Sequence, residues 1–255
     1  MVLRRIKMKR YPVLILAYKR TTELELALES LKQLNPSIVY FHLHNAPEGD
    51  IEGQKQVELV KKLIISYGGE KEVRYSKEAL GVRASMYSAL AWISEKEETF
   101  FVWEDDIVLK PNSAKKIEKY MSKLEKEDGV VKFGEYRNWA VYWGWATTAK
   151  TAKRLIDKAV WELPEAVVKP YFQDAFHYKG TMELHKRGQY HAWDDEFGLI
   201  TKILGVNEIL SKEQLTDHIG FQSTRTDNGI DKVFGRGTHV TFRNGVLVPK
   251  ENDNA

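Results

Sequence analysis

The sequence predicts an α/β fold, with an open, mostly parallel sheet and helices on both of its faces. Two observations lead to this fold class. In the first half, short apolar runs alternate with longer segments in which apolar residues recur at helical spacing. The run 13–17 is also uninterrupted, as is typical of a parallel strand buried on both faces. In sheets of this kind, ligands lie at the carboxyl ends of the strands.

The expected elements follow in order along the chain. Strands are expected at 13–17, 38–43, 73–75 and 99–103, and helices over 21–34, around 57–64 and over 82–93. Pro111 is expected to open the next helix, because the first helical position does not need its N–H group. The second half is less regular, with turn signals at Gly144, Gly180 and Gly188. A helix is expected over 148–159, and another begins at Trp193.

The composition indicates a single domain over residues 1–255. Hydrophobic residues make up 43% and aromatic residues 11% of the chain, which is enough for a packed core. The net charge of +3 gives no case for nucleic-acid binding. The chain has no cysteine, which excludes disulfides, thiolate metal sites and cysteine nucleophiles. This absence also fits the reducing cytoplasm, and we expect a cytoplasmic protein.

The start of the chain has the order of features of a signal peptide, because basic residues precede the apolar run 11–18. The run is short, however, and Lys19 and Arg20 close it. We therefore expect a buried first strand, and no stretch approaches the ~20 apolar residues that span a bilayer. The basic leader is expected to be solvated, with weak contact to an anionic membrane surface as the alternative.

Three carboxylates, Glu104, Asp105 and Asp106, directly follow the fourth apolar strand. Charged side chains are costly to bury unless they are paired or bound to a metal. At the ligand edge of a sheet they form a natural site for Mg²⁺ or Mn²⁺, which can bridge the phosphates of a nucleotide. The alternative interpretation is an acidic turn that caps the next helix.

The segment 100–109 resembles the metal-binding motif of GT-A glycosyltransferases, which have a Rossmann-like fold. It is most similar to the Glu-Asp-Asp version in the N-acetylglucosaminyltransferases that build N-glycan antennae. The resemblance implies that Asp106 binds the Mn²⁺ or Mg²⁺ ion and that Glu104 contacts the nucleotide sugar, with Asp105 between them in the donor site. It also implies a nucleotide-sugar-binding half over about 11–110 and an acceptor and catalytic half over about 111–245.

The first strand also looks like that of the family, where the strand end contacts the nucleotide. Ala17 and Tyr18 would make this contact, and Arg20 would approach the diphosphate or remain a solvated residue. Asn45 stands where the family commonly has an aspartate that binds uracil. This departure leaves the identity of the nucleotide base undetermined, although a UDP-sugar is the expected donor.

Two further residues have both a donor-site and a structural interpretation. Arg83 opens the helix 82–93, where the family packs the donor, and it could hold a phosphate or lie on the helix surface. Trp145 belongs to the aromatic stretch 142–146, which resembles the family's donor-pocket lining and could equally be core.

The segment 191–197 resembles the Trp-Asp-Asp element of the same transferases, whose first aspartate is the catalytic base. The resemblance selects Asp194, with its neighbour Asp195 facing the helix N-terminus or the acceptor. The structural alternative is that both carboxylates only complement the helix dipole. His218, in the segment 215–224, looks like part of a His-Ile-Gly element that closes the active site. It could bind the metal or a phosphate, or be structural.

Together these features predict a metal-dependent, inverting glycosyltransferase. It would move a sugar from a nucleotide-sugar donor to a hydroxyl of a glycan, a lipid-linked or a protein acceptor. One alternative is a sugar nucleotidyltransferase, which would need a glycine-rich phosphate loop after the first strand, whereas residues 17–22 contain no glycine. The other is a non-catalytic glycan-binding module, which would leave the acidic strand end unexplained.

Overall fold

The computed structural model describes residues 9–136, 139–157, 163–171, 193–220, 240–243 and 246–249. A seven-stranded sheet in the order β3-β2-β1-β4-β7-β6-β8 forms its centre. Within this sheet β7 runs antiparallel to its two neighbours, while the other pairings are parallel. The predicted open, mostly parallel sheet is therefore confirmed. Its strands are β1 (Val13–Ala17), β2 (Val39–His44), β3 (Lys71–Ser76), β4 (Thr99–Glu104), β6 (Val130–Tyr136), β7 (Trp139–Thr148) and β8 (Glu208–Leu210).

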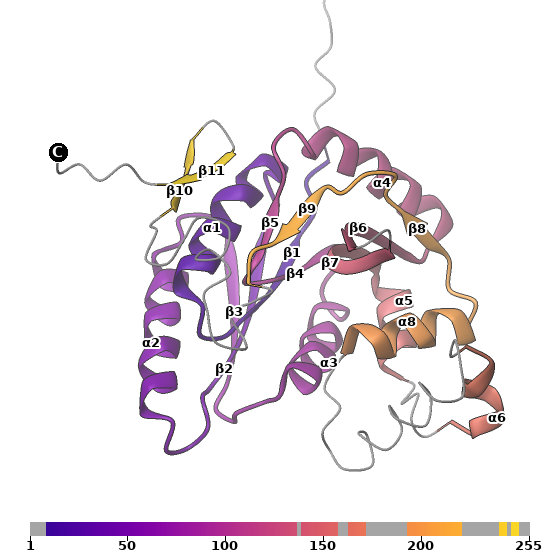
Figure 1. Cartoon of the computed structure of the whole chain (residues 1–255), viewed down its shortest axis with the longest axis horizontal. Helices are drawn as coiled ribbons and strands as arrows, with labels where there is room; N and C mark the ends of the chain where they lie inside the picture. Colours follow the sequence, from indigo (N-terminus) through magenta and orange to yellow (C-terminus); the bar gives the residue numbers. More distant parts are fainter. Residues whose placement is uncertain are drawn as a thin grey trace, which may run out of the picture.

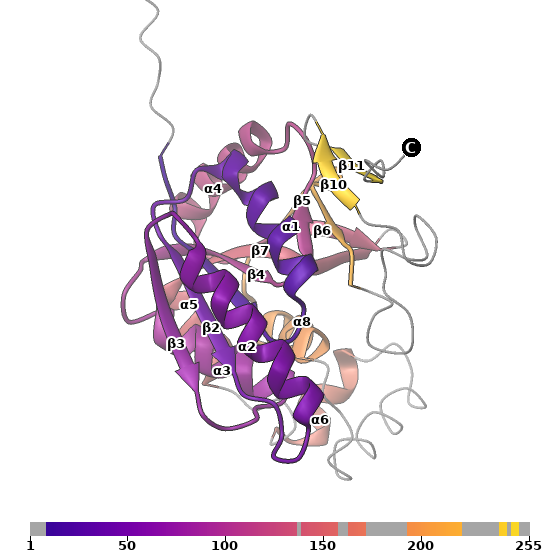
Figure 2. The ribbon, with the colours of Figure 1, turned by 90° about the vertical axis from the view of Figure 1, so that its left-hand side faces the viewer.

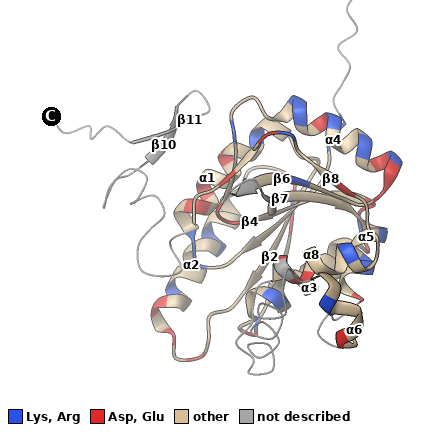
Figure 3. Cartoon of the chain, turned by 45° about the vertical axis from the view of Figure 1, so that its right-hand side comes forward, with Lys and Arg blue, Asp and Glu red and all other residues tan. Residues whose placement is uncertain are grey.

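Helices cover both faces of the sheet, as predicted (Figure 1). The alternation of side chains along β1 explains this, because Ile15 packs into one core and Leu16 into the other. One face carries α1 (Thr21–Leu31), α2 (Ile51–Ser66) and α4 (Ala114–Glu127). The opposite face carries α3 (Val82–Ile93), α5 (Ala149–Ile156) and α8 (Trp193–Ile203). The exposed surface of α4 mixes basic and acidic side chains, as expected for a solvated helix (Figure 3).

Short elements complete the described part of the chain. β5 (Ile107–Leu109) pairs antiparallel with β9 (Thr216–His218) and so brings residue 218 beside the acidic segment that follows β4. The remaining elements are η1 (Lys32–Leu34), α6 (Glu165–Val168), η3 (Lys169–Tyr171), β10 (Val240–Arg243) and β11 (Val246–Pro249). No described helix combines the length and the apolar character needed to cross a membrane.

The structure corrects one predicted boundary and adds strands in the second half. Pro111 does not open α4, which begins at Ala114; the two are separated by a turn in which Asn112 has a left-handed φ of 62°. The glycine at 144 does not end a strand either, because it lies within β7. Its φ is 70°, and a Cβ atom there would come within 2.9 Å of Thr216 Cγ2. Gly144 therefore allows β9 to pack closely on the sheet.

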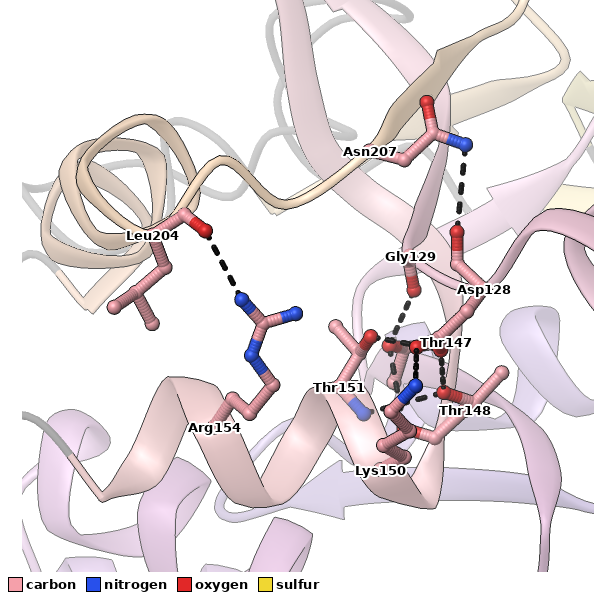
Figure 4. A network of polar contacts seen from close by, with 9 residues as sticks. All are labelled: Asp128, Gly129, Thr147, Thr148, Lys150, Thr151, Arg154, Leu204 and Asn207. Atoms are coloured by element: carbon pink, nitrogen blue, oxygen red, sulfur yellow. Dashed lines mark hydrogen bonds and ion pairs between the residues drawn. The ribbon is translucent and has the colours of Figure 1, made fainter.

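A polar network anchors β6, β7 and α5 at the amino-terminal edge of the parallel strands (Figure 4). The Asp128 carboxylate accepts hydrogen bonds from the hydroxyls of Thr148 and Thr151, the latter at 2.9 Å, and pairs with Lys150 at 3.3 Å. Thr148 also caps α5 by accepting from the backbone N–H of Thr151. This network lies at the opposite end of the sheet from the ligand edge.

Part of the basic leader lies outside the described residues, which begin at Lys9. Lys9 pairs with Glu125 on α4, and the Arg10 guanidinium donates to the carbonyls of Asn35 and Pro36. These two basic residues are therefore bound to the folded domain. Weak membrane contact by the basic leader as a whole stays a prediction.

β1 is the point at which the strand order reverses, because the chain continues from β1 to β2 on one side and returns to β4 on the other. The β1–β2 connection passes through α1 on one face of the sheet, and the β3–β4 connection passes through α3 on the opposite face. In open α/β sheets a ligand crevice forms at such a point.

Candidate active site

A cavity of about 940 Å³ lies at the carboxyl ends of β1 and β4. It is lined by the end of β1, the first turns of α1 and α3, the end of β4, and the segment after β9. Six of the residues predicted for the site line this cavity: Ala17, Tyr18, Arg20, Glu104, Asp105 and His218. Residues that are up to 201 positions apart in sequence are thus brought to one wall, as expected for the ligand edge of the sheet.

The end of β1 holds the acidic segment in place. The backbone N–H of Tyr18 donates to Asp105 Oδ2 at 2.9 Å, and Arg20 Nη1 donates to Asp105 Oδ1 at 2.9 Å. Arg20 also forms an ion pair with Asp106. Both carboxylates are buried, so the guanidinium neutralises part of a charge that water does not reach.

Asp106 lies behind the cavity wall and not on it. Its side chain is fully buried, and His218 Nε2 lies 3.7 Å from its Oδ2 atom. Gly220 covers it so closely that a Cβ atom at position 220 would come within 2.1 Å of Asp106 Oδ2. Any residue larger than glycine at position 220 would have to displace the carboxylate. Gly220 is the glycine of the His-Ile-Gly element, so the sequence did carry a signal for this contact.

Burial is the main reason why the pKa of each carboxyl group in this cluster is raised. The pKa of Glu104 rises to about 8, and the charges of Asp106 and Asp105 add to the effect of burial. The pKa values of Asp105 and Asp106 rise to about 6, with Arg20 partly offsetting burial. Because a raised carboxyl pKa favours the protonated folded state, these groups reduce stability as the pH rises from about 4 to about 8. Three carboxyl groups thus lie close to one guanidinium, and at neutral pH the raised pKa of Glu104 favours its protonated form.

The imidazole of His218 lies beside this cluster, next to Asp106. Burial, and then the positive charge of Arg20, lower the pKa of His218 to about 4. A neutral imidazole can be a metal ligand or a hydrogen-bond partner at neutral pH. The described residues contain no group of three or more His, Cys, Asp or Glu side chains already arranged around a cation position.

A second part of the lining is suited to anions. The first residues of α1, Thr21 and Thr22, and of α3, Val82, line the cavity, so the N-termini of two helices face it. Within the described part of the chain, the N-cap residues Arg20 and Gly81 make no side-chain capping bond, although the buried Glu23 carboxylate in the first turn of α1 bonds its own backbone N–H. The N–H groups and the positive end of the dipole at a helix N-terminus favour phosphate. Lys19 and Arg20 line the same side, where Lys19 pairs with Asp50 and Arg20 pairs with Asp105 and Asp106.

Aromatic and polar side chains form the part of the wall beyond β1. The rings of Tyr18 and His44 stack with their centroids 4.3 Å apart and their planes at 20°. Lys19 is fixed by Asp50 at 2.5 Å, and Gln56 also lines the cavity. Asn45, which the sequence suggested as a base contact, is not on this lining, whereas its neighbour His44 is. Adjacent residues leave a strand end in opposite directions, and the sequence alone did not show which of the two faces the cavity.

Arg83 is bound by Glu196 and does not line the cavity. Its Nε and Nη2 atoms donate to the two Glu196 oxygens at 2.6 and 2.9 Å, and Glu196 is fully buried. The guanidinium also lies over the Tyr87 ring at 4.6 Å. This bidentate pair joins α3 to the first turns of α8, a partner that the sequence analysis did not identify.

The aromatic stretch of β7 packs beneath α8. Trp145 is almost fully buried, and its ring contacts Trp193 and Phe197 at centroid distances of 6.1 Å each. The Tyr142 ring completes the cluster, with its centroid 5.5 Å from that of Trp193. The structure therefore places Trp145 in the core, where it supports the start of α8, and not on the cavity lining.

Asp194 follows Trp193 in the first turn of α8 and is half-buried. Its negative charge makes the smallest of the contributions that raise the pKa of Glu104, and Asp194 is not among the residues that line the cavity. The side chain of Asp195 and the residues 191–192 lie outside the described part of the structure. The described carboxyl groups on the lining are those of Glu23, Glu104 and Asp105.

Comparisons with known proteins do not assign a family. No protein-family model matches the chain, and no curated protein matches it in sequence. Among solved structures, it is similar to a mannosyltransferase from Pyrobaculum calidifontis in complex with GDP-Man and Mn²⁺, with 12% identity and a TM-score of 0.48, covering 85% of this chain and 59% of that one. It is also similar to 4-diphosphocytidyl-2C-methyl-D-erythritol synthase from Anaerococcus prevotii, with 9% identity and a TM-score of 0.45, covering 84% and 94%. At these TM-scores the likeness carries no argument about function, and the fold assignment rests on the strand order of the chain itself.

Proposed function

We propose that this protein is a nucleotide-sugar-dependent glycosyltransferase that acts with a divalent cation. The proposal rests on one observation: a single cavity wall combines groups that suit phosphates with carboxylates that suit a cation. Two helix N-termini with Lys19 and Arg20 suit the phosphates of a nucleotide, and the carboxylates Glu104 and Asp105 lie directly beside them. A nucleoside diphosphate with its bound cation has the same two kinds of charge.

The residues present fit a divalent cation that arrives together with the nucleotide. Mg²⁺ and Mn²⁺ prefer oxygen ligands, and Mg²⁺ is usually held by one or two carboxylates plus substrate phosphates. The ion is assigned to Asp106, with His218 3.7 Å from it. Because Asp106 lies behind the cavity wall, its carboxylate would turn toward the cavity to reach the ion, beside Glu104 and Asp105 on the lining. A bound cation supplies positive charge next to the leaving diphosphate.

The other steps are assigned to side chains of this chain. The stacked pair of Tyr18 and His44 would support the base, and Arg20 would approach the diphosphate. Asp194 would accept the proton of the acceptor hydroxyl as that oxygen attacks the anomeric carbon. The bond from this carbon to the diphosphate oxygen then breaks, and the electron pair leaves with the diphosphate. Attack from the face opposite the leaving group gives inversion.

We expect binding of a nucleoside diphosphate to require a divalent cation. Calorimetric titration of UDP and GDP should give a measurable affinity with Mn²⁺ that is lost on chelation, because the phosphates and carboxylates repel each other without the ion. Asp106→Ala should abolish this metal dependence. Asp217→Asn is the matched control, because Asp217 lies on the same strand as His218 but pairs with Lys110 on the surface. Equal affinities with and without metal in the unmodified protein would contradict the assignment.

Slow hydrolysis of at least one nucleotide sugar is expected in the absence of an acceptor. Water can replace the acceptor hydroxyl when the base and the cation are in place. Release of nucleoside diphosphate from a panel of UDP- and GDP-sugars measures this reaction, and the Asp194→Asn variant serves as the blank. Formation of pyrophosphate from a nucleoside triphosphate and a sugar 1-phosphate, without diphosphate release, would instead identify a nucleotidyltransferase.

A further inference from the structure

β3 is the edge strand of the sheet, and its outer edge is open among the described residues (Figure 2). It pairs with β2 on one side only. Three apolar side chains near this edge are exposed: Val73 at 45%, Tyr75 at 38% and Ile65, at the end of α2, at 73%. An exposed edge strand presents a row of unpaired N–H and C=O groups that can bind another strand.

The backbone alternation shows which residues face outward. The carbonyl of Glu70 accepts from the N–H of Val39 at 2.9 Å, and the carbonyl of Ser76 accepts from the N–H of Asn45 at 3.2 Å. Backbone groups of alternate residues point to the same neighbour in a strand ladder, so the even-numbered residues 70–76 bond to β2. The N–H and C=O groups of the odd-numbered residues 71, 73 and 75 therefore point away from the sheet.

Lysine side chains often protect an edge strand, but the one on β3 is folded back. Lys71 Nζ donates to the carbonyls of Ile65 at 2.7 Å and Tyr67 at 2.5 Å, at the carboxyl end of α2. Its charge is thereby used to satisfy the end of that helix. Lys61 likewise lies over the Tyr75 ring at 4.0 Å, on the face of the strand. Neither ammonium group extends beyond the strand to obstruct a partner.

We propose that a second copy of this chain pairs with the edge of β3 in an antiparallel ladder, with Val73 opposite Val73 of the second copy. The order of charges along the strand favours this register. Glu72, which pairs with Lys96 of its own copy at 3.0 Å, then lies opposite Arg74 of the second copy, and the two-fold symmetry repeats this pair. A ladder centred on residue 72 would place Glu72 opposite Glu72, and one centred on residue 74 would place Arg74 opposite Arg74. Both registers put like charges opposite each other, which is unfavourable.

The same register satisfies the outward backbone groups. Residues 71, 73 and 75 of one copy meet residues 75, 73 and 71 of the other as hydrogen-bonded pairs. Val73 and Tyr75 pair in register with Phe41 and Leu43, whose side chains belong to the core beneath α2. Their side chains therefore share the face on which Ile65 lies, and the exposed apolar residues of the two copies come together. The cavity remains open, because β2 separates β3 from β1.

Sedimentation velocity of the full chain tests the proposal. We expect a concentration-dependent equilibrium of monomer and dimer. Arg74→Glu places like charges opposite each other twice and should raise the dissociation constant about tenfold or more. The double variant Glu72→Arg/Arg74→Glu restores opposite charges and should recover the dimer. Lys116→Glu, on the surface of α4, is the control and should leave the dissociation constant unchanged, and far-ultraviolet circular dichroism confirms that each variant is folded.

Hydrogen exchange at low and high protein concentration gives a second readout that does not depend on mutations. The amides of Lys71, Val73 and Tyr75 should become protected as the dimer forms, whereas those of Glu72 and Arg74 are protected by β2 at every concentration. A chain that stays monomeric at every concentration overturns the proposal. So does a dimer that is insensitive to Arg74→Glu or that leaves the amides 71, 73 and 75 unprotected.

Discussion

Asp194→Asn is expected to lower kcat by a factor of ~10² to 10⁴, the usual contribution of a general base. The amide keeps the shape of the side chain but cannot accept the proton of the acceptor hydroxyl. Donor affinity should change little, because in the proposed site the phosphates and the base would be held by the ends of β1 and β2 and by the first turns of α1 and α3. The measurement is kcat together with the dissociation constant of the nucleotide.

The neighbouring carboxylate provides the control. Successive residues of a helix point about 100° apart, since there are ~3.6 residues per turn, so Asp194 and Asp195 cannot both face the anomeric carbon in one pose. Asp195→Asn is expected to affect stability or acceptor affinity more than turnover. Loss of turnover in Asp195→Asn with an active Asp194→Asn would show that the other carboxylate is the base. If both variants stay active, the two residues only complement the dipole of α8.

Arg83→Met is expected to destabilise the protein by about 3 kcal/mol. This is the lower end of the range for breaking a buried ion pair, because one third of the Arg83 side chain reaches solvent while Glu196 is fully buried. The variant leaves a buried carboxylate without its guanidinium, and the cost of this unpaired buried charge is the expected loss. Urea unfolding of the variant and the unmodified protein measures the difference in the free energy of unfolding.

A double variant distinguishes the effect of the unpaired buried charge on stability from the effect of the position of α8 on turnover. Arg83→Met/Glu196→Met should recover most of the lost stability, because an apolar pair of similar volume can replace a buried ion pair. If the pair also positions Asp194, kcat should stay low in the double variant although the protein is stable. Lys116→Met is the matched control for removing a basic residue: its pair with Glu213 is half exposed and should be worth less than about 1 kcal/mol. An equal loss in Arg83→Met and Lys116→Met would contradict this account.

The parallel part of the fold was predictable because its signals are local. β1 at Val13–Ala17 and α3 at Val82–Ile93 have the predicted bounds, since a continuous apolar run and a helical repeat each mark their own element. β7 was not predicted. Its tryptophans and tyrosines suit a core or a ligand surface equally well, and the glycine at 144 has the sequence appearance of a turn. A long-range contact shows why that glycine lies within a strand. Thr216, which is 73 residues from Trp143, donates a hydrogen bond to the Trp143 carbonyl and approaches Gly144 closely.

The site was predictable where it lies at the ends of parallel strands, which meet at one edge of the sheet. This rule is sufficient to bring Arg20 and Asp105 together. It gives no information about side-chain direction, so it did not distinguish His44 from Asn45 on the lining. It also gives no information about helix–helix contacts. The Arg83–Glu196 pair joins residues 113 positions apart, and nothing in the local sequence of either helix indicates the other.

The packing of Trp193 against Trp145 beneath α8 provides an optical signal that reports on the position of the proposed base. Trp193 precedes Asp194 directly, and its indole lies over that of Trp145 at 6.1 Å with the planes at 28°. Fixed aromatic packing of this kind produces a near-ultraviolet circular dichroism signal, which disappears when the packing is lost. The backbone that carries Asp194 cannot leave its place without changing that pair. A spectrum recorded without any substrate therefore distinguishes a variant that has lost its proton acceptor from one in which the acceptor has been displaced.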